Sequence, residues 1–374
     1  MTETALAAPL TATPLASLLA STEPHTEIAA YHGVLTPLEL DARASEIAAL
    51  ATGAALHDLG WLRRVVVRGE DRFRWLSGMV TNMVNDLPAN SGAWNLVLNA
   101  QGRIQGDLTV WREEPALELE IYADQYEKLL AHLDRFIIMD DVELAGRDAT
   151  VETALGLTGP RAAEVLRRLG LPTLSDPLTS TSAEWNGIDL RIRRGYGVLA
   201  DHYVLWTPVA MVSKLWPCLT TGGAIPVGSA ALESFRIAEG IPVYGVEIVE
   251  KDLAQETSQM RSLNFNKGCY LGQEIVERIR SRGNVHKHLR ALELDGPLPE
   301  VGTELMQEGT PEGQTDGHIR SVAELPIAGF LRRFALAMMR GEAELRDKPF
   351  KYSSGEAAGT ARLLAGPPNL YHNG

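Results

Sequence analysis

Residues 61–87, WLRRVVVRGEDRFRWLSGMVTNMVNDL, decide the fold class of the N-terminal half of the chain. The β-branched run Val65–Val67 favours a strand, and the segment after it has the pattern of a helix. Residues 93–113 then predict two strands joined by a glycine-containing turn. Residues 123–138 predict a helix, because their apolar positions have helical spacing, and residues 140–145 predict a returning strand. This order of elements is typical of an α+β unit of the ferredoxin-like kind.

A second unit of the same kind is predicted immediately after the first. Residues 151–170 indicate a strand, a Gly-Pro turn and a helix, and residues 187–208 indicate two further strands. MVSKLWPCL (211–219) favours a helix, and a strand near GGAIPVG (222–228) would complete the unit.

The pattern changes in the last part of the chain. Residues 229–240 predict a helix that starts at a serine and stops at a glycine. From residue 289 onward, short apolar segments are separated by Gly and Pro, which predicts a small β-barrel or sandwich at the C-terminus. The fold class is therefore α+β.

Composition restricts the class of protein. A chain of 374 residues is long enough for two or three domains. Its formal net charge of −13 argues against general affinity for nucleic acid or for an anionic membrane, and no apolar run is long enough to span a bilayer. Two cysteines cannot form a disulfide framework, so a reducing cytoplasm is expected. The first 20 residues contain no Lys or Arg, unlike a secretory or transit peptide, and we expect residues 1–30 to be a loose extension.

The segment NKGCYLGQE (266–274) carries the strongest chemical signal. Cys269 lies between glycines, close to Lys267 and just before a predicted helix, and both the cation and the helix start would favour a thiolate. Two readings remain open for this cysteine: a reactive or cluster-contacting thiol, or a small side chain packed in a tight turn. By contrast, Cys218 lies in an apolar helical segment, where a small buried side chain is the ordinary explanation.

Two further segments contain candidate binding residues. The strip after the motif is basic and could receive a polyanionic ligand tail or an acidic partner, or it could be a solvated face balanced by acidic neighbours. Its cationic side chains are Arg278, Arg280, Arg282, Lys287 and Arg290. His286 and His288 alternate within the strip, but with no third ligand nearby we predict no metal site. In NAQGRIQGDL, Asp107 enters a strand, where its carboxylate could accept from a ligand amine, act as a base or cap the turn.

Residues 267–274 resemble the signature K-G-C-[YF]-x-G-Q-E of the YgfZ-type folate-binding proteins. That branch serves iron–sulfur enzymes and is related to the aminomethyltransferase (T-protein) of glycine cleavage. The matching residues are Lys267, Gly268, Cys269, Tyr270, Gly272, Gln273 and Glu274. The segments WLSGMVTNMVNDL, LGLTGPRA and GHIRSVAELPIAGFLRRFALA are similar to further family patterns, so the resemblance covers residues 30–350, more or less the whole chain.

The resemblance implies three domains arranged as a ring around a central folate site. The implied first α+β domain is residues 31–150, and the second is residues 151–228. A return segment, residues 229–288, completes the folate site and carries the motif, and residues 289–374 form the barrel. It also implies that tetrahydrofolate is bound through Asp107, Tyr196 and Glu239, and that Cys269 acts together with Lys267.

The chain departs from the T-protein pattern at two places. T-proteins have paired aspartates where this chain has Gly106 and Asp107, so one carboxylate is absent. Their R-L-E-A-G segment, whose glutamate binds the pterin, reads R-I-A-E-G here. This moves the carboxylate to Glu239, one position later, and one helical position is a rotation of about 100°.

These observations favour an accessory factor that assembles or maintains iron–sulfur clusters in client enzymes with the help of tetrahydrofolate. Cys269 would contact a cluster transiently, because one thiol cannot retain a cluster unaided. Expected partners are client enzymes or assembly proteins; sulfur-modified tRNA would be affected only indirectly, and neither a membrane nor direct nucleic-acid binding is expected. The alternatives are a tetrahydrofolate-dependent aminomethyltransferase, and a folate- or nucleotide-binding scaffold in which Cys269 is structural.

Overall fold

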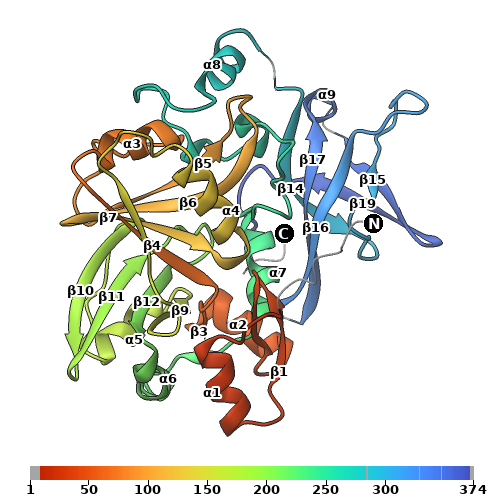
Figure 1. The fold of residues 1–374 in the computed structure, drawn as a ribbon. Coiled ribbons are helices and arrows are strands. Elements are labelled where there is room, and N and C mark those ends of the chain that lie inside the picture. The colour runs from red at the N-terminus through yellow and green to blue at the C-terminus, as the bar shows by residue number, and fades with distance from the viewer. Residues whose placement is uncertain (1–8, 284, 328, 347, 371–374) are drawn as a thin grey trace, which may run out of the picture.

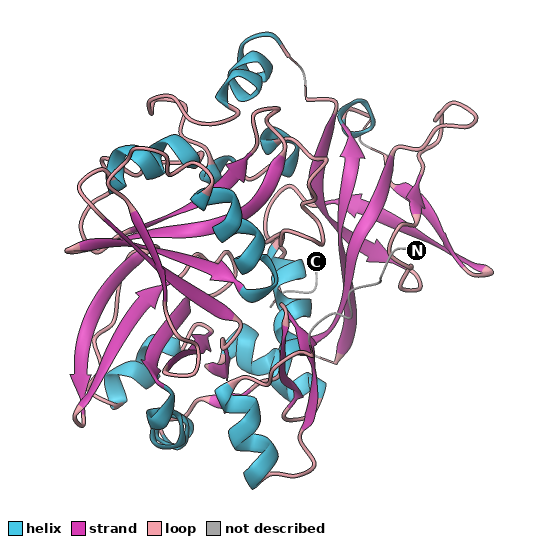
Figure 2. Cartoon of the chain, in the orientation of Figure 1, coloured by secondary structure: helices cyan, strands magenta, loops and turns pink. Residues whose placement is uncertain are grey.

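The computed structural model describes residues 9–370 except 284, 328 and 347, and the side chain of Arg282 lies outside the described part. Three large β-sheets and one two-stranded sheet surround helix α7 (Ser229–Glu239) (Figure 1). Helices lie against the first two sheets, whereas the third part is built mainly of strands (Figure 2). The predicted α+β class with a barrel-like C-terminal domain is confirmed. Within the described ranges, no helix has the length and apolar character needed to cross a bilayer.

The first sheet has the strand order β5-β6-β7-β4-β8, and all neighbouring strands are antiparallel. Its elements are β4 (Leu62–Arg68), α3 (Arg72–Met79), β5 (Gly92–Leu98), β6 (Ile104–Glu113), β7 (Ala116–Tyr122), α4 (Ala123–Asp134) and β8 (Glu143–Gly146). Strand β7 is absent from the sequence-based prediction. Its alternating sequence buries Leu117 and Leu119 in the core shared with α3 and α4. The intervening residues Glu118 and Glu120 therefore face the opposite side of the sheet.

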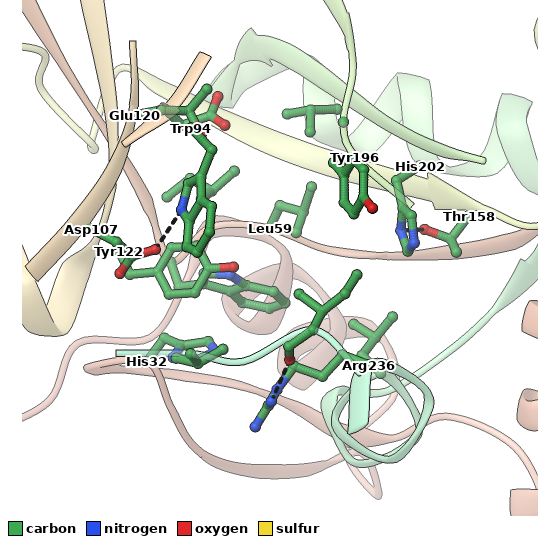
Figure 3. A pocket seen from close by; sticks show the side chains of 18 of the residues that line it. His32, Leu59, Trp94, Asp107, Glu120, Tyr122, Thr158, Tyr196, His202 and Arg236 are labelled. Atoms are coloured by element: carbon green, nitrogen blue, oxygen red, sulfur yellow. Dashed lines mark hydrogen bonds between the residues drawn. The ribbon is translucent and has the colours of Figure 1, made fainter. Parts of the chain in front are cut away.

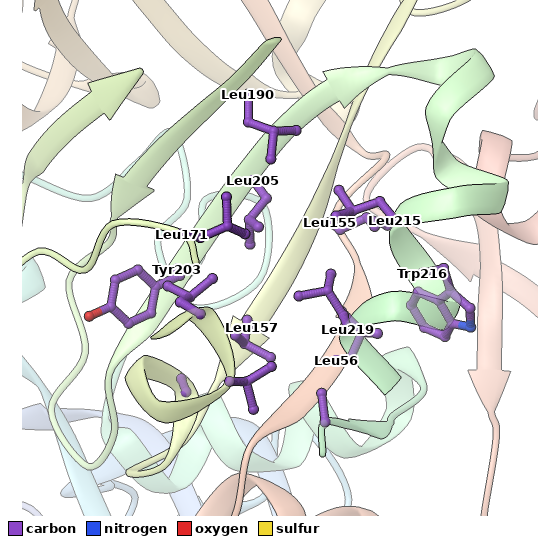
Figure 4. Close-up of a cluster of buried hydrophobic side chains, with 14 of the residues drawn as sticks. Leu56, Leu155, Leu157, Leu171, Leu190, Tyr203, Leu205, Leu215, Trp216 and Leu219 are labelled. Atoms are coloured by element: carbon purple, nitrogen blue, oxygen red, sulfur yellow. The ribbon is translucent and has the colours of Figure 1, made fainter. Parts of the chain in front are cut away.

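The second sheet has the order β10-β11-β12-β9-β3-β13 and contains one strand from the N-terminal region. Its elements are β3 (Ala55–Asp58), β9 (Glu152–Thr158), α5 (Ala162–Arg168), β10 (Thr179–Trp185), β11 (Ile188–Arg194), β12 (His202–Pro208), α6 (Val212–Thr221) and β13 (Ile225–Pro226), with a 3₁₀ turn at Val209–Met211. Leucines from the strands and from α5 and α6 form its core (Figure 4). Leu56 of β3 is fully buried in that core.

The N-terminal segment differs from the loose extension that the sequence suggested. Residues 1–8 lie outside the described part of the chain, but Pro14–Thr22 form helix α1, whose first turn is capped by the hydroxyl of Thr13. Leu15 and Leu19 of α1 are buried in the second core. Strand β1 (Glu27–Tyr31) pairs with β2 (Val34–Glu39), and α2 (Arg43–Thr52) leads into β3. The prediction was wrong because burial of these apolar side chains against a distant sheet is not visible in local sequence. Residues 31–150 do not form one unit either, because strand β3 of this range belongs to the second sheet.

The C-terminal sheet has the order β15-β16-β17-β14-β19-β18 and is nearly closed. Its elements are β14 (Lys287–Asp295), β15 (Glu304–Leu305), β16 (Gly317–Ile327), β17 (Phe330–Arg340), α9 (Gly341–Glu344), β18 (Phe350–Ser354) and β19 (Ala357–Leu363). Met306, directly after β15, exchanges two backbone hydrogen bonds of 3.1 and 2.7 Å with Lys351 of β18. Helices α2 and α7 pack against β16 and so attach the barrel to the rest of the molecule.

A buried network of charges joins the first two sheets. Arg193 of β11 has no exposed side-chain surface and forms ion pairs with three glutamates of the first sheet: Glu113, Glu118 and Glu120. Arg64 of β4 also binds Glu118, at 2.6 Å, and crosses to Glu152 of β9 at 3.0 Å. Because these carboxylates and guanidinium groups are removed from water, each needs its partners to remain charged at low energetic cost.

We expect Glu118→Gln to lower the free energy of unfolding by about 3–5 kcal/mol, since it leaves two buried guanidinium groups short of a carboxylate. Urea unfolding at neutral pH measures the change. Glu184→Gln, at an exposed position on β10, is the matched control and should alter stability by less than about 0.5 kcal/mol.

Glu118 also makes the free energy of unfolding depend on pH in the acid range. Burial alone would raise the pKa of Glu118, but the charges of Arg193 and Arg64 outweigh it and lower the pKa from 4.5 to about 2. Between these values the unfolded chain binds more protons, so this contribution to stability is complete above pH 4.5 and disappears as the pH falls towards 2. The acid dependence of stability in this range should be weaker in Glu118→Gln than in the parent; identical profiles would contradict the assignment.

Candidate functional site

A cavity of about 240 Å³ lies where the first sheet, the second sheet and α7 meet. Its wall is mostly aromatic and apolar, with a few polar groups spread around it (Figure 3). The residues that carry its chemistry are Tyr31, His32, His57, Trp94, Asp107, Trp111, Glu120, Tyr122, Thr158, Tyr196, His202, Arg236, Glu239 and Arg261. All three residues predicted to bind folate, Asp107, Tyr196 and Glu239, are among them.

Asp107 supplies a buried carboxylate that two side chains hold in place. It lies within β6 rather than in a turn, where Trp94 Nε1 donates to its Oδ2 at 2.8 Å and Gln125 Nε2 donates to its Oδ1 at 2.9 Å. Burial raises the pKa of Asp107, and the two hydrogen bonds oppose that effect. The group can therefore accept a further hydrogen bond or a proton from a molecule in the cavity.

Gly106 faces away from this cavity. A Cβ atom at Gly106 would lie 2.8 Å from Gln125 Oε1 and 2.8 Å from Leu129 Cδ2, both on α4. Adjacent residues of a strand point to opposite faces, which is why Asp107 reaches the cavity and position 106 does not. The missing second carboxylate therefore removes no group from the cavity wall, and its absence is weak evidence against aminomethyl transfer.

Glu239, on the last turn of α7, is already occupied by protein partners. Its Oε1 accepts from the backbone N–H groups of Val198 at 3.0 Å and Leu199 at 2.8 Å. Its Oε2 lies 3.0 Å from Nε2 of His202. The carboxylate thus anchors the loop that carries Tyr196, and the folate contact predicted for Glu239 stays a prediction.

A hydrogen-bonded chain of side chains extends from Glu239 into the second sheet. Thr158 Oγ1 lies 3.0 Å from His202 Nδ1 and 3.0 Å from His57 Nε2. Burial lowers the pKa of His57 to about 3, so its ring is neutral and its Nδ1–H donates to the carbonyl of Asp58. The hydroxyl of Thr158 then donates to Nε2 of His57, and Nδ1–H of His202 donates to Oγ1 of Thr158. Burial would lower the pKa of His202, but the Glu239 carboxylate outweighs this and raises it.

Gly156 makes room for this chain. The imidazole of His57 lies across it, so that a Cβ at Gly156 would be 1.9 Å from His57 Cε1. Any larger residue would displace the ring, and the position of His57 therefore depends on a glycine on the neighbouring strand β9.

Lys267 of the motif is enclosed by backbone carbonyl groups. Its ammonium donates to the carbonyl oxygens of Ser77 at 2.8 Å, Val80 at 2.5 Å and Asn82 at 2.7 Å, at and beyond the C-terminal end of α3. Burial lowers the pKa of Lys267 to about 7, whereas the carbonyl oxygens stabilise the charged form. Within the described residues it makes no hydrogen bond to Cys269. These contacts give Lys267 a structural role, and the catalytic role predicted for it stays a prediction.

The two cysteines are both exposed. Exposure of Cys269 excludes the reading in which it is a small buried side chain. Exposure of Cys218 contradicts the prediction that it is buried, because it lies on the outer face of α6, whose inner face carries Leu215 and Leu219. Cys269 is not part of the cavity wall, so the thiol and the cavity are separate places on the molecule.

The other motif residues hold the loop against the first sheet. Gly272 has φ +82°, and a Cβ there would lie 2.6 Å from the carbonyl oxygen of Asn99. Gly268 has open space around it, so it is not required sterically. Tyr270 is buried in the same apolar cluster as Trp94, and this cluster connects the motif to the cavity wall. Gln273 and Glu274 begin helix α8 (Gln273–Arg282) as predicted, with Gln273 Oε1 accepting from Tyr270 N at 3.3 Å.

The basic strip is largely neutralised. Lys287 pairs with Asp252 at 3.2 Å, and both His288 and Arg290 contact Glu344. Arg280 stacks on Phe265 and lies 3.5 Å from Glu277. Arg278 is exposed, with no ion pair among the described residues. This pattern supports the interpretation of a solvated face balanced by acidic neighbours.

Comparison with known proteins gives matches to one family model and to several named relatives. A family model described as the GCVT N-terminal domain matches residues 27–267. A chloroplastic protein of Arabidopsis thaliana named as a transferase is 27% identical, and the match covers 75% of this chain but only 65% of that protein. The aminomethyltransferase of Thermoanaerobacter sp. strain X514 is 24% identical, over 86% of this chain and 90% of the relative. An aminomethyltransferase of Thermus thermophilus is 27% identical, over 80% of this chain and 85% of the relative.

A solved structure has the same fold. The glycine cleavage system aminomethyltransferase T from Bartonella henselae superposes with a TM-score of 0.84 at 18% sequence identity, covering 96% of this chain and 98% of the other.

Substitutions in the motif loop should separate structure from chemistry. Lys267→Met should cost about 1–3 kcal/mol, because it leaves the carbonyl groups without their donor, whereas Cys269→Ala and Cys269→Ser should each change stability by less than about 0.5 kcal/mol. Urea unfolding measures all three, with Lys214→Met, at an exposed position on α6, as the matched control. A large loss of stability in Cys269→Ala would show that the thiol is needed for packing.

Proposed function

Because the chain belongs to the GCVT N-terminal domain family, we propose that its central cavity binds a reduced folate, with tetrahydrofolate as the ligand. The observation that carries this proposal is the Asp107 carboxylate, buried in an aromatic cavity and oriented by Trp94 and Gln125. A reduced pterin has a flat pyrimidinone ring and several N–H donors, so it matches a site with aromatic walls and one oriented acceptor.

The biological role that we propose is that of a YgfZ-type accessory factor, acting in the cytoplasm on iron–sulfur clusters of client enzymes or assembly proteins. The signature around Cys269 supports this role, as does the exposure of its thiol. An exposed thiol outside the cavity can reach a cluster held by another protein, and one thiolate supplies one ligand of the several that a cluster needs. Effects on sulfur-modified tRNA would follow through a client enzyme.

Aminomethyl transfer is the second candidate. It is favoured by relatives named aminomethyltransferase that match over most of their length, and by the orientation of Gly106 away from the cavity. Asp107, the carboxylate that faces the cavity, is retained in this chain. The two candidates share the folate and differ in whether the chain transfers a one-carbon unit from an aminomethyl carrier.

Titration calorimetry with tetrahydrofolate tests the shared part of the proposal. We expect binding, together with a rise in melting temperature that increases with ligand concentration by mass action. Asp107→Asn keeps the shape of the side chain and removes its charge, so affinity should fall about 10- to 100-fold. Asp189→Asn, at an exposed position on β11, is the control and should bind as the parent does. Absence of heat and of any thermal shift at saturating ligand would exclude folate binding.

Two assays on the parent protein and on Cys269→Ala separate the candidates. With an aminomethyl-lipoyl carrier protein and tetrahydrofolate, we expect no release of ammonia. In cells that lack the native protein, we expect the parent to restore an iron–sulfur client enzyme and Cys269→Ala to fail, while Cys218→Ala restores it as the parent does. Clear ammonia release would favour aminomethyl transfer, and full rescue by Cys269→Ala would end the role proposed for the thiol.

A further inference from the structure

Arg261 lines the cavity as a guanidinium group held between two aromatic rings. Its Cζ lies 3.7 Å from the ring centroid of Tyr196 and 4.5 Å from that of Trp94. The residue belongs to the 3₁₀ turn Met260–Ser262, and its backbone carbonyl accepts from Asn82 Nδ2 at 2.8 Å. Its Nε donates to Gln259 Oε1 at 3.0 Å, which fixes the plane of the guanidinium group.

Among the described residues, no carboxylate balances this cation, whereas Arg236, His202 and His32 of the same cavity each have a carboxylate partner. Arg236 is paired with Glu233 and Glu247. His202 is paired with Glu239, and His32 with Asp124. For Arg261, no carboxylate oxygen of the described ranges lies within 4.0 Å.

The terminal nitrogens of Arg261 remain available to a ligand. Nε is the only side-chain nitrogen of Arg261 that makes a hydrogen bond to the described residues, so the two terminal NH₂ groups have none. Burial lowers the pKa of Arg261 to about 10, and Tyr196, Asp107 and Glu239 oppose that shift. The group is thus charged at neutral pH, partly removed from water, and presents donors that no atom of the described residues uses.

We propose that Arg261 binds a carboxylate of the cavity ligand and so determines its specificity for a ligand with an anionic tail. This rests on the proposed function: in a folate, the carboxylates belong to the glutamate joined to the p-aminobenzoyl group. A planar guanidinium group with two free NH₂ groups matches a carboxylate in a bidentate arrangement. The aromatic rings on either side hold it in that orientation before the ligand arrives.

The surrounding residues indicate how the ligand would be oriented in the cavity. Asp107 binds the indole nitrogen of Trp94, while Arg261 lies over the ring of the same Trp94. Tyr196, on the other side of Arg261, is 38% exposed, so this end of the cavity is nearer to solvent. The reduced ring would therefore lie towards Asp107, and the glutamate tail would leave the cavity past Arg261 and Tyr196.

Calorimetry on the full chain tests this with ligands that differ in the anionic tail. The probes are tetrahydrofolate, 6-methyltetrahydropterin, which lacks the p-aminobenzoylglutamate, and p-aminobenzoyl-L-glutamate alone. We expect Arg261→Met to weaken tetrahydrofolate about 10- to 100-fold and to abolish binding of p-aminobenzoyl-L-glutamate, while the affinity for 6-methyltetrahydropterin changes less than about twofold. Arg261→Lys, which keeps the charge but not the planar fork, should lie between the parent and Arg261→Met. Arg278→Met, at an exposed arginine without an ion pair among the described residues, is the matched control.

The outcomes separate this inference from the proposed function. If Arg261→Met binds tetrahydrofolate as tightly as the parent does, Arg261 does not recognise the tail. The same conclusion follows if Arg261→Met loses affinity for 6-methyltetrahydropterin and for tetrahydrofolate to the same extent. If the parent binds p-aminobenzoyl-L-glutamate through Arg261 but neither reduced pterin compound, the assignment of the ligand as a folate is wrong and that of Arg261 stands. If ATP binds and Arg261→Met abolishes that binding, while p-aminobenzoyl-L-glutamate does not bind to the parent, the anion is a phosphate and the carboxylate proposal is overturned.

Discussion

Arg193 is the residue on which the arrangement of the first two sheets depends. It is fully buried, and it binds carboxylates from two strands of the first sheet: Glu113 of β6, and Glu118 and Glu120 of β7. A buried guanidinium group tolerates only geometries in which its donors are satisfied, so it restricts how the sheets can be placed even where it adds little net stability. It also stacks on Trp111 at 4.7 Å. Because Trp111 and Glu120 line the cavity, the same network shapes the cavity wall.

The cavity and the cysteine motif are connected through the first sheet rather than by direct contact. Lys267 ties the motif to the end of α3, and Tyr270 packs in the cluster that contains Trp94. Trp94 in turn orients Asp107 and supports Arg261. Occupation of the cavity would therefore act on the wall against which the motif loop packs. This offers a physical route by which a bound folate could order the loop that presents Cys269, without the ligand and the thiol meeting.

The sequence predicts much of the local structure because local structure follows short-range patterns. The helix predicted at residues 229–240 is α7, and Gly240 ends it at φ +74°. The helix after Gly272 is α8, and the barrel strands follow their apolar spacing. Strand β7 could also have been found, because ALELEIY alternates apolar and acidic residues.

Features that depend on distant segments could not be predicted in this way. Strand β3 joins the second sheet across about a hundred residues of chain, and α1 is buried against the same sheet. The partners of Lys267 are backbone carbonyl groups, which no side-chain pattern reveals. Arg261 and the chain formed by His57, Thr158, His202 and Glu239 carry no local motif, since each acquires its role only when two sheets and α7 meet around the cavity.

A crystal structure of the protein with tetrahydrofolate tests the central claim most directly. We expect the reduced ring in the central cavity beside Asp107, with a glutamate carboxylate in contact with the guanidinium group of Arg261. A folate bound elsewhere on the molecule, with the central cavity empty, would contradict it.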